Sequence, residues 1–159
     1  MSVVIKAAVI LALLVEAVAV LFAVAGLHES NPVFGIVFLV LVIGLNVACV
    51  FWVLKRTAAD NGYGKQLLNA TVLGLVAGTL IFVLSVVNLK LLFPDYIEQS
   101  NTAMLEFFEG LSMPEAALEQ QAAKLEARTA VGESLNALIG TFFTSLIGGA
   151  IVAIFKRKK

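Results

Sequence analysis

The sequence predicts an all-α integral membrane protein with four transmembrane helices and a helical extracytoplasmic segment between the third and fourth. Hydrophobic residues make up 60% of the chain, and the mean hydropathy of +1.00 exceeds what a soluble domain of this size needs for its core. The apolar residues fall into four runs of about bilayer-spanning length. No alternating strand pattern is present, and backbone groups in lipid must be satisfied within the spanning element, so helices are the expected form.

The first predicted span covers residues 4–27 and carries a carboxyl group, Glu16, near its middle. A charge at this depth costs at least roughly 2.5 kcal/mol on insertion scales. Glu16 shares a helix face with Ala12, Ala19 and Ala23, so we expect it to turn toward other helices rather than toward lipid.

A secretory signal is the competing interpretation of this first segment. Lys6 precedes the apolar stretch, and the Ala-Val-Ala sequence at residues 23–25 resembles a cleavage site. The stretch is longer than the usual core of a signal and contains Glu16. Retention as a helix is therefore the better interpretation.

Further spans are predicted at residues 33–54, 67–93 and 130–155, within a single membrane domain. Gly26 is a natural end for the first helix. The Asn-Pro pair at residues 31–32 supplies a capping residue and a first-turn proline for the second.

The distribution of basic residues predicts the orientation of the chain. By the positive-inside rule, the side with most of them is cytoplasmic. Trp52 lies at that end of the second span, where an aromatic ring anchors a helix at the interface. Both termini are therefore expected in the cytoplasm. The basic residues on that side are Lys6, Lys55, Arg56, Lys65, Lys156, Arg157, Lys158 and Lys159, against Lys90, Lys124 and Arg128 on the other.

Small side chains predict the faces on which the spans pack, because lipid tails give helices no hydrophobic reason to associate. The candidate packing residues are Gly74 and Gly78 in the third span and Gly140 and Gly148 in the fourth. Such stripes form contacts either within a bundle or between subunits. A homo-oligomer is therefore one possible arrangement.

Glu16 also belongs to a candidate buried polar site. If the helices are simple antiparallel neighbours, its expected hydrogen-bond partners are Asn46 in the second span and Thr141 or Thr144 in the fourth. In the conservative interpretation a protonated Glu16 is a packing contact. In the functional one it exchanges protons along a pathway.

The outer segment, residues 94–129, predicts two helices. Ile97 and Phe108 follow helical spacing in the first half, and Ser112 with Glu115 forms a capping-box pattern that starts the second. The segment is rich in acidic residues, which usually form a solvated face.

The functional alternative for this segment is a docking surface for a partner outside the cytoplasm. An aromatic pair, Phe107 and Phe108, is the candidate interaction surface if it does not cover the bundle.

The sequence offers no recognisable catalytic, cofactor or metal site. His28 is the only histidine, which excludes a multi-histidine metal site, and Cys49 is the only cysteine, which excludes a disulfide. The formal net charge of zero gives no support for a nucleic-acid partner. We expect a protein that is not an enzyme and that needs no cofactor.

In order and spacing, several short motifs resemble those of the bacterial membrane-protein family known as domain of unknown function 4199, over nearly the whole chain. The resemblance implies a four-helix protein of a bacterial cytoplasmic (inner) membrane and implies no catalytic residue or ligand. The motifs are Gly26-Leu27-His28-Glu29, Tyr63-Gly64-Lys65-Gln66, Pro94-Asp95-Tyr96, Met113-Pro114-Glu115-Ala116 and Ile139-Gly140.

Two functions stay open. The first is a non-enzymatic membrane component that binds or supports a partner: an unidentified membrane or extracytoplasmic protein, with the lipid bilayer around the bundle. The second is a small proton-coupled carrier or channel that uses Glu16. Against the carrier, the chain lacks obvious inverted repeats and broken helices, and four spans would need to oligomerise to enclose a pathway.

Overall fold

The computed structural model describes residues 3–111 and 113–156. Over this part of the chain the structure is helical throughout with short connections and no strand, which confirms the all-α prediction. Ser112 of the predicted capping box and the basic residues Arg157, Lys158 and Lys159 lie outside the described residues.

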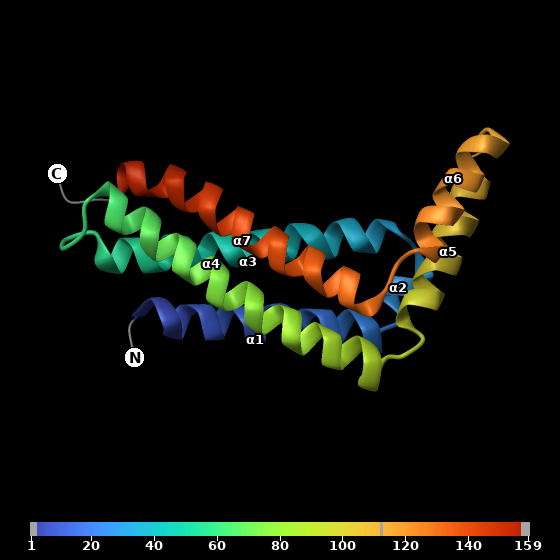
Figure 1. The fold of residues 1–159 in the computed structure, drawn as a ribbon, viewed down its shortest axis with the longest axis horizontal. Helices are drawn as coiled ribbons and strands as arrows, with labels where there is room; N and C mark the ends of the chain where they lie inside the picture. The colour runs from blue at the N-terminus through green and yellow to red at the C-terminus, as the bar shows by residue number, and fades with distance from the viewer. Residues whose placement is uncertain (1–2, 112, 157–159) are drawn as a thin grey trace.

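Four long helices lie side by side and form a bundle (Figure 1). Each is long and apolar enough to cross a membrane, by length and composition. The third continues through a short π-helical turn, η1 (Asn88–Leu92), and so reaches 30 residues in all. The four helices are α1 (Val3–Val24), α3 (Val33–Thr57), α4 (Tyr63–Val87) and α7 (Ala130–Phe155).

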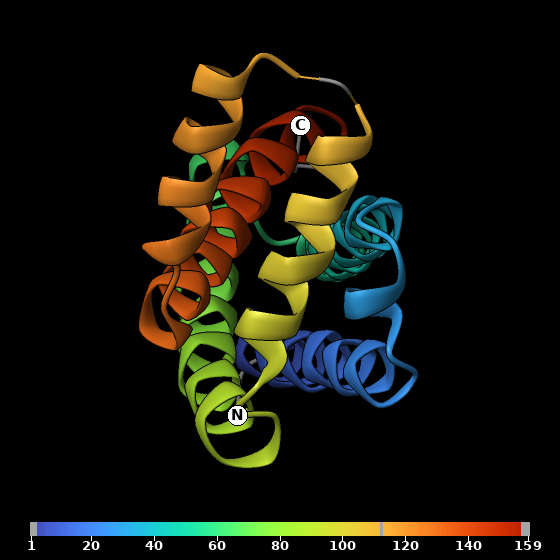
Figure 2. The ribbon, with the colours of Figure 1, turned by 90° about the vertical axis from the view of Figure 1, so that its right-hand side faces the viewer.

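A helical hairpin closes the end of the bundle that lies opposite the two termini (Figure 1). It consists of α5 (Tyr96–Gly110) and α6 (Glu115–Glu126), which run side by side and crosswise to the bundle (Figure 2). The short helix α2 (Leu27–Ser30) packs against α5. The two helices expected in the outer segment are thus present.

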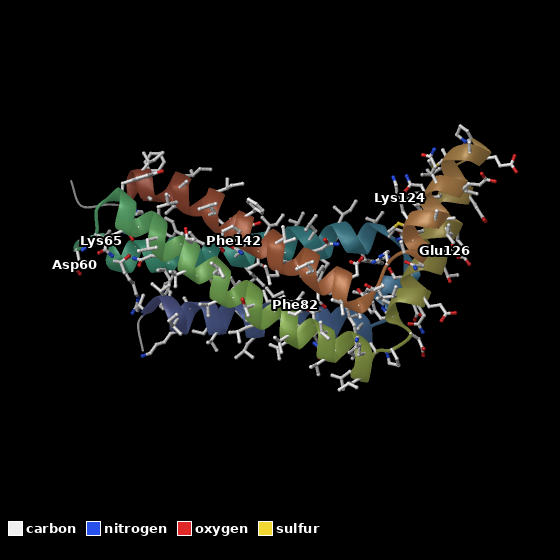
Figure 3. The ribbon with its side chains drawn as sticks, in the orientation of Figure 1. Asp60, Lys65, Phe82, Lys124, Glu126 and Phe142 are labelled. Carbon is white, nitrogen blue, oxygen red and sulfur yellow. The ribbon has the colours of Figure 1, made fainter. Side chains whose placement is uncertain are left out.

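Polar and apolar side chains separate along the molecule (Figure 3). Asp60 and Lys65 lie at the end that holds the termini, and Lys124 and Glu126 lie on the hairpin. Phe82 lies on the bundle between these ends. This distribution suits a bundle whose middle contacts lipid and whose two ends contact water.

The turns at the hairpin end follow from local chemistry. Gly26 adopts a left-handed conformation with φ of +65° and ends α1, and such a conformation favours glycine. The side chain of Asn31 accepts a hydrogen bond from the backbone N–H of Val33 at 2.9 Å and so caps α3.

The helices form a ring in which α4 packs against α1 and α7, and α3 packs against the same two helices from the other side. The fully packed core belongs to the half of the bundle near the termini. Its largest fully buried apolar side chains are Leu11, Val50, Val53, Leu54 and Leu73, whereas the fully buried Ile81 lies in the other half of the bundle.

A buried glutamine adds polar contacts at the same end. Gln66 of α4 donates from Nε2 to the backbone carbonyl oxygens of Leu54, at 2.8 Å, and Lys156, at 2.7 Å. Thr57 donates to its Oε1 atom at 2.6 Å. These bonds join the ends of α3, α4 and α7, so the bundle is tightly closed on the side of the termini.

Two glycines of α4 lie where α7 approaches closely. A methyl group on Gly74 would lie 2.6 Å from Cβ of Ser145, and one on Gly78 would lie 3.0 Å from the carbonyl oxygen of Leu138. Both positions therefore allow a contact between α4 and α7 that a larger side chain would disturb.

The glycines predicted to pack on α7 lie differently. Among the described residues, no heavy atom outside the helix's own local backbone comes within 4 Å of a methyl group built on Gly140, and such a group on Gly148 meets only Val47, at 3.8 Å. The prediction that Gly140 is a packing residue is therefore wrong within this chain. The buried face is rotated by one residue and contains Ser134, Thr141, Ser145, Gly149 and Ala153.

Candidate functional site

The half of the bundle near the hairpin contains a cavity of about 670 Å³. Its walls come from all four long helices, and α2 and α5 form its roof. All four residues of the predicted polar site, Glu16, Asn46, Thr141 and Thr144, line it. The volume lies within the range of about 300–1,000 Å³ that is typical of small-molecule sites.

Glu16 reaches this cavity from α1 and is only 6% exposed. Its Oε1 atom accepts a hydrogen bond from the hydroxyl of Ser85 at 2.6 Å, and its Oε2 atom accepts one from the side-chain amide of Asn88 at 2.6 Å. Each carboxyl oxygen therefore has a neutral donor, Ser85 from α4 and Asn88 from the adjoining η1.

The expected partners of Glu16 were wrong. The polar face of α1 packs along α4, whereas the prediction placed the partners on the second and fourth spans. Asn88 lies where α4 continues into η1 and reaches inward to Glu16. Ser85 had no role in the sequence-based prediction.

Asn46 instead joins α3 to α7 at the buried side of the cavity. It is 2% exposed, its Nδ2 atom donates to the backbone carbonyl of Thr141 at 3.1 Å, and its Oδ1 atom accepts from the hydroxyl of Ser145 at 2.9 Å. Both ends of the amide are thus satisfied. Thr144 also lies on α7, where its half-buried side chain lines the cavity.

The roof of the cavity contains a stacked aromatic pair. The rings of His28 on α2 and Tyr96 on α5 lie 4.2 Å apart at an interplanar angle of 10°, and Nε2 of His28 is 3.0 Å from Oε1 of Gln99. Nδ1 of the same ring is buried and has no hydrogen-bond partner among the described residues. From the sequence, His28 was considered only as a possible metal ligand.

Arg128, in the connection between α6 and α7, fixes the hairpin to the bundle. Its Nε atom forms an ion pair with Glu133 at 2.9 Å, and its Nη1 atom donates to Oδ1 of Asn101 on α5 at 2.8 Å.

The pKa of the nearby Tyr96 hydroxyl is raised above its ordinary value, chiefly by burial. The positive charge of Arg128 lowers this pKa, and the negative charge of Glu133 raises it.

The cavity is also open toward the side, between α3 and α7. Six of its lining residues are exposed: Asn31 before α3, Gly35, Leu39 and Ile43 on α3, and Asn136 and Gly140 on α7. In a membrane, this opening would face the hydrocarbon of the leaflet nearer the hairpin. The cavity therefore combines an apolar entrance with buried polar groups.

The candidate interaction surface lies apart from this cavity. Phe107 and Phe108 are on α5 with ring centroids 6.1 Å apart. Phe107 is 38% exposed, whereas Phe108 is half-buried. One ring of the pair is therefore available to a partner.

Metal binding has no support from the arrangement of side chains. Over residues 3–111 and 113–156, no group of three or more histidine, cysteine, aspartate or glutamate side chains could hold a metal ion.

The fold and the cavity define a four-helix protein with the composition of a membrane bundle and a helical roof. The model of the family described as Protein of unknown function (DUF4199) matches residues 6–158, so the chain belongs to this family, and the resemblance seen in the motifs is confirmed. Comparison with curated proteins and with solved structures found no match.

Proposed function

We propose that the chain is a multi-pass protein of a bacterial cytoplasmic membrane, with both termini in the cytoplasm and the hairpin outside. Lys55, Arg56 and Lys65 lie at the end with the termini, in agreement with the positive-inside rule. The guanidinium of Arg56 lies 4.7 Å from the centre of the Trp52 ring, an arrangement suited to the membrane interface.

Within this frame, the protein is a non-enzymatic binding protein whose partner is a small amphiphilic molecule. The observation that supports this proposal is the 670 Å³ cavity, because it places Glu16 and other polar groups beneath apolar walls that open toward lipid. The tightly packed half of the bundle lies below it and supports its shape. The hairpin serves as the roof of the site.

Native mass spectrometry of the protein, extracted from its host membrane into lipid nanodiscs, tests this function. We expect the wild-type chain to retain a small molecule and the cavity-filling variant Gly140→Trp to lose it. The control is Ile147→Trp, which adds the same ring to an exposed position of the same helix. Retention of the same molecule by Gly140→Trp would contradict a binding site in this cavity.

A proton-coupled carrier is the second candidate, because Glu16 lines the cavity with neutral hydrogen-bond donors at both of its oxygens. Transport would require the packed half of the bundle to open. The carrier predicts proton-coupled solute flux into vesicles that Glu16→Gln abolishes and that the exposed control Glu109→Gln leaves intact. Unchanged flux in Glu16→Gln would remove this carboxyl group from the mechanism.

A further inference from the structure

We infer that the molecule bound in the cavity is an organic cation with an apolar body, and that its charged group binds Glu16. This inference rests on the proposed binding function and adds the sign and place of the ligand's charge. It follows from the hydrogen bonds of Glu16, the charge balance of the cavity and the aromatic rings in its walls.

Glu16 has the capacity for a further partner. A carboxylate accepts about four hydrogen bonds, and Ser85 and Asn88 supply one to each oxygen. No lysine, arginine or histidine of residues 3–111 and 113–156 forms an ion pair with Glu16. An ammonium or similar cation would supply both the missing charge and the missing contacts, which a buried carboxylate needs.

The charge of Glu16 determines the sign of the cavity's net charge, because the other two charged side chains in the cavity cancel. Arg128 and Glu133 both line the cavity, but they neutralise each other in an ion pair of 2.9 Å. An ionised Glu16 therefore gives the cavity a net negative charge, which favours a cation and disfavours an anion.

The walls suit a cation that carries an apolar body. The rings of Phe38, Phe93 and Tyr96 line the cavity, and aromatic faces attract cations that have left water. The opening between α3 and α7 provides room for the apolar body to extend toward lipid.

The outer surface would also attract cations. Beside the roof, a groove of about 500 Å³ runs between α2 and α5 and is lined by Glu29, Asp95, Glu98 and Glu106. Carboxylates gathered around a cleft raise the local concentration of cations and their association rate. The groove thus raises the rate at which the cation associates, while Glu16 binds the cation in the cavity.

Binding of two ions of the same shape and opposite charge tests this inference. The full chain in phosphatidylcholine nanodiscs is titrated with tetraphenylphosphonium or tetraphenylborate by equilibrium dialysis, with empty nanodiscs as the blank. We expect the cation to bind at least about tenfold more tightly than the anion, and Glu16→Gln to weaken cation binding by about tenfold or more. Glu16→Asp, which keeps the charge, restores part of the affinity.

The exposed variant Glu109→Gln makes the same chemical change on α5 outside the cavity and is expected to leave the affinity within about twofold. Equal binding of both ions, or unchanged cation binding in Glu16→Gln, would overturn the inference about charge; if Gly140→Trp then still abolished binding, the cavity would remain a binding site. Binding of neither ion would overturn the inference and count against the proposed function as well.

Discussion

Substitution of Gly74 by alanine tests the close contact between α4 and α7. The added carbon would lie 2.6 Å from Cβ of Ser145 and 3.2 Å from Cα of Phe142. Carbon atoms pack best at separations of about 3.5–4.0 Å, so the first contact is too short by about 1 Å. Because Cα of Phe142 belongs to the backbone, a change of side-chain rotamer cannot relieve the second contact.

We expect this variant to lower the free energy of unfolding by about 1–3 kcal/mol, the usual cost of one extra carbon in a packed interface. Gly140→Ala is the matched control: it adds the same methyl group to α7, where the described residues leave open space around it. Since alanine is a better helix former than glycine, that variant is expected to be neutral or up to about 1 kcal/mol more stable.

The assay is reversible unfolding in mixed micelles of dodecyl maltoside and dodecyl sulfate, followed by circular dichroism. Gly74→Ala should unfold at a lower fraction of dodecyl sulfate than the wild type, and Gly140→Ala should not. Equal loss of stability in the two variants would refute the reasoning, because it would show that helix packing does not distinguish the two positions.

Three further predictions concern polar groups. Asn46→Ala should cost about 1 kcal/mol of unfolding free energy in the same assay, because it removes two bonds between helices, whereas Asn136→Ala should cost less than about 0.5 kcal/mol. Arg128→Met should speed amide hydrogen exchange in α5 roughly fivefold, since it removes contacts that hold the hairpin, together worth about 1 kcal/mol; unchanged exchange would contradict that role. Burial raises the pKa of Tyr96, so the folded state keeps the phenol protonated, and the stability this provides is lost as the pH rises above about 10. The difference in stability between wild type and Tyr96→Phe should therefore change above that pH and stay constant below it.

The four long helices and the hairpin were predictable because their signals are local. A run of some twenty apolar residues has few other structural solutions, and Gly26 and the Asn-Pro pair at residues 31–32 act within a single turn. The inward orientation of Glu16 also followed from one helix, because its face carries small residues and a lipid-facing carboxyl group is costly.

The contacts of the site depend on how helices are rotated and shifted against each other, which a single sequence does not determine. On α7, Gly140, Thr144 and Gly148 form one small-residue stripe, and the adjoining face that includes Thr141 and Ser145 forms another. Composition alone cannot choose between them, and the structure buries the second.

The roof was missed for a related reason. His28 and Tyr96 are separated by 68 positions in the sequence numbering and meet only because α2 packs on α5. Neither residue belongs to a motif with a recognised chemistry. Pairing of two isolated aromatic residues leaves no signal in one sequence.

Thiol labelling at Gly140 tests most directly the central claim, a binding cavity that opens between α3 and α7. In a Cys49→Ala background, Gly140→Cys and Ile147→Cys in nanodiscs are labelled with membrane-permeant N-ethylmaleimide, with and without saturating tetraphenylphosphonium. Because position 140 lines the cavity and position 147 does not, the bound cation is predicted to slow labelling at position 140 and to leave labelling at position 147 unchanged. An equal effect of the cation at both positions, or no effect at position 140, would contradict the account.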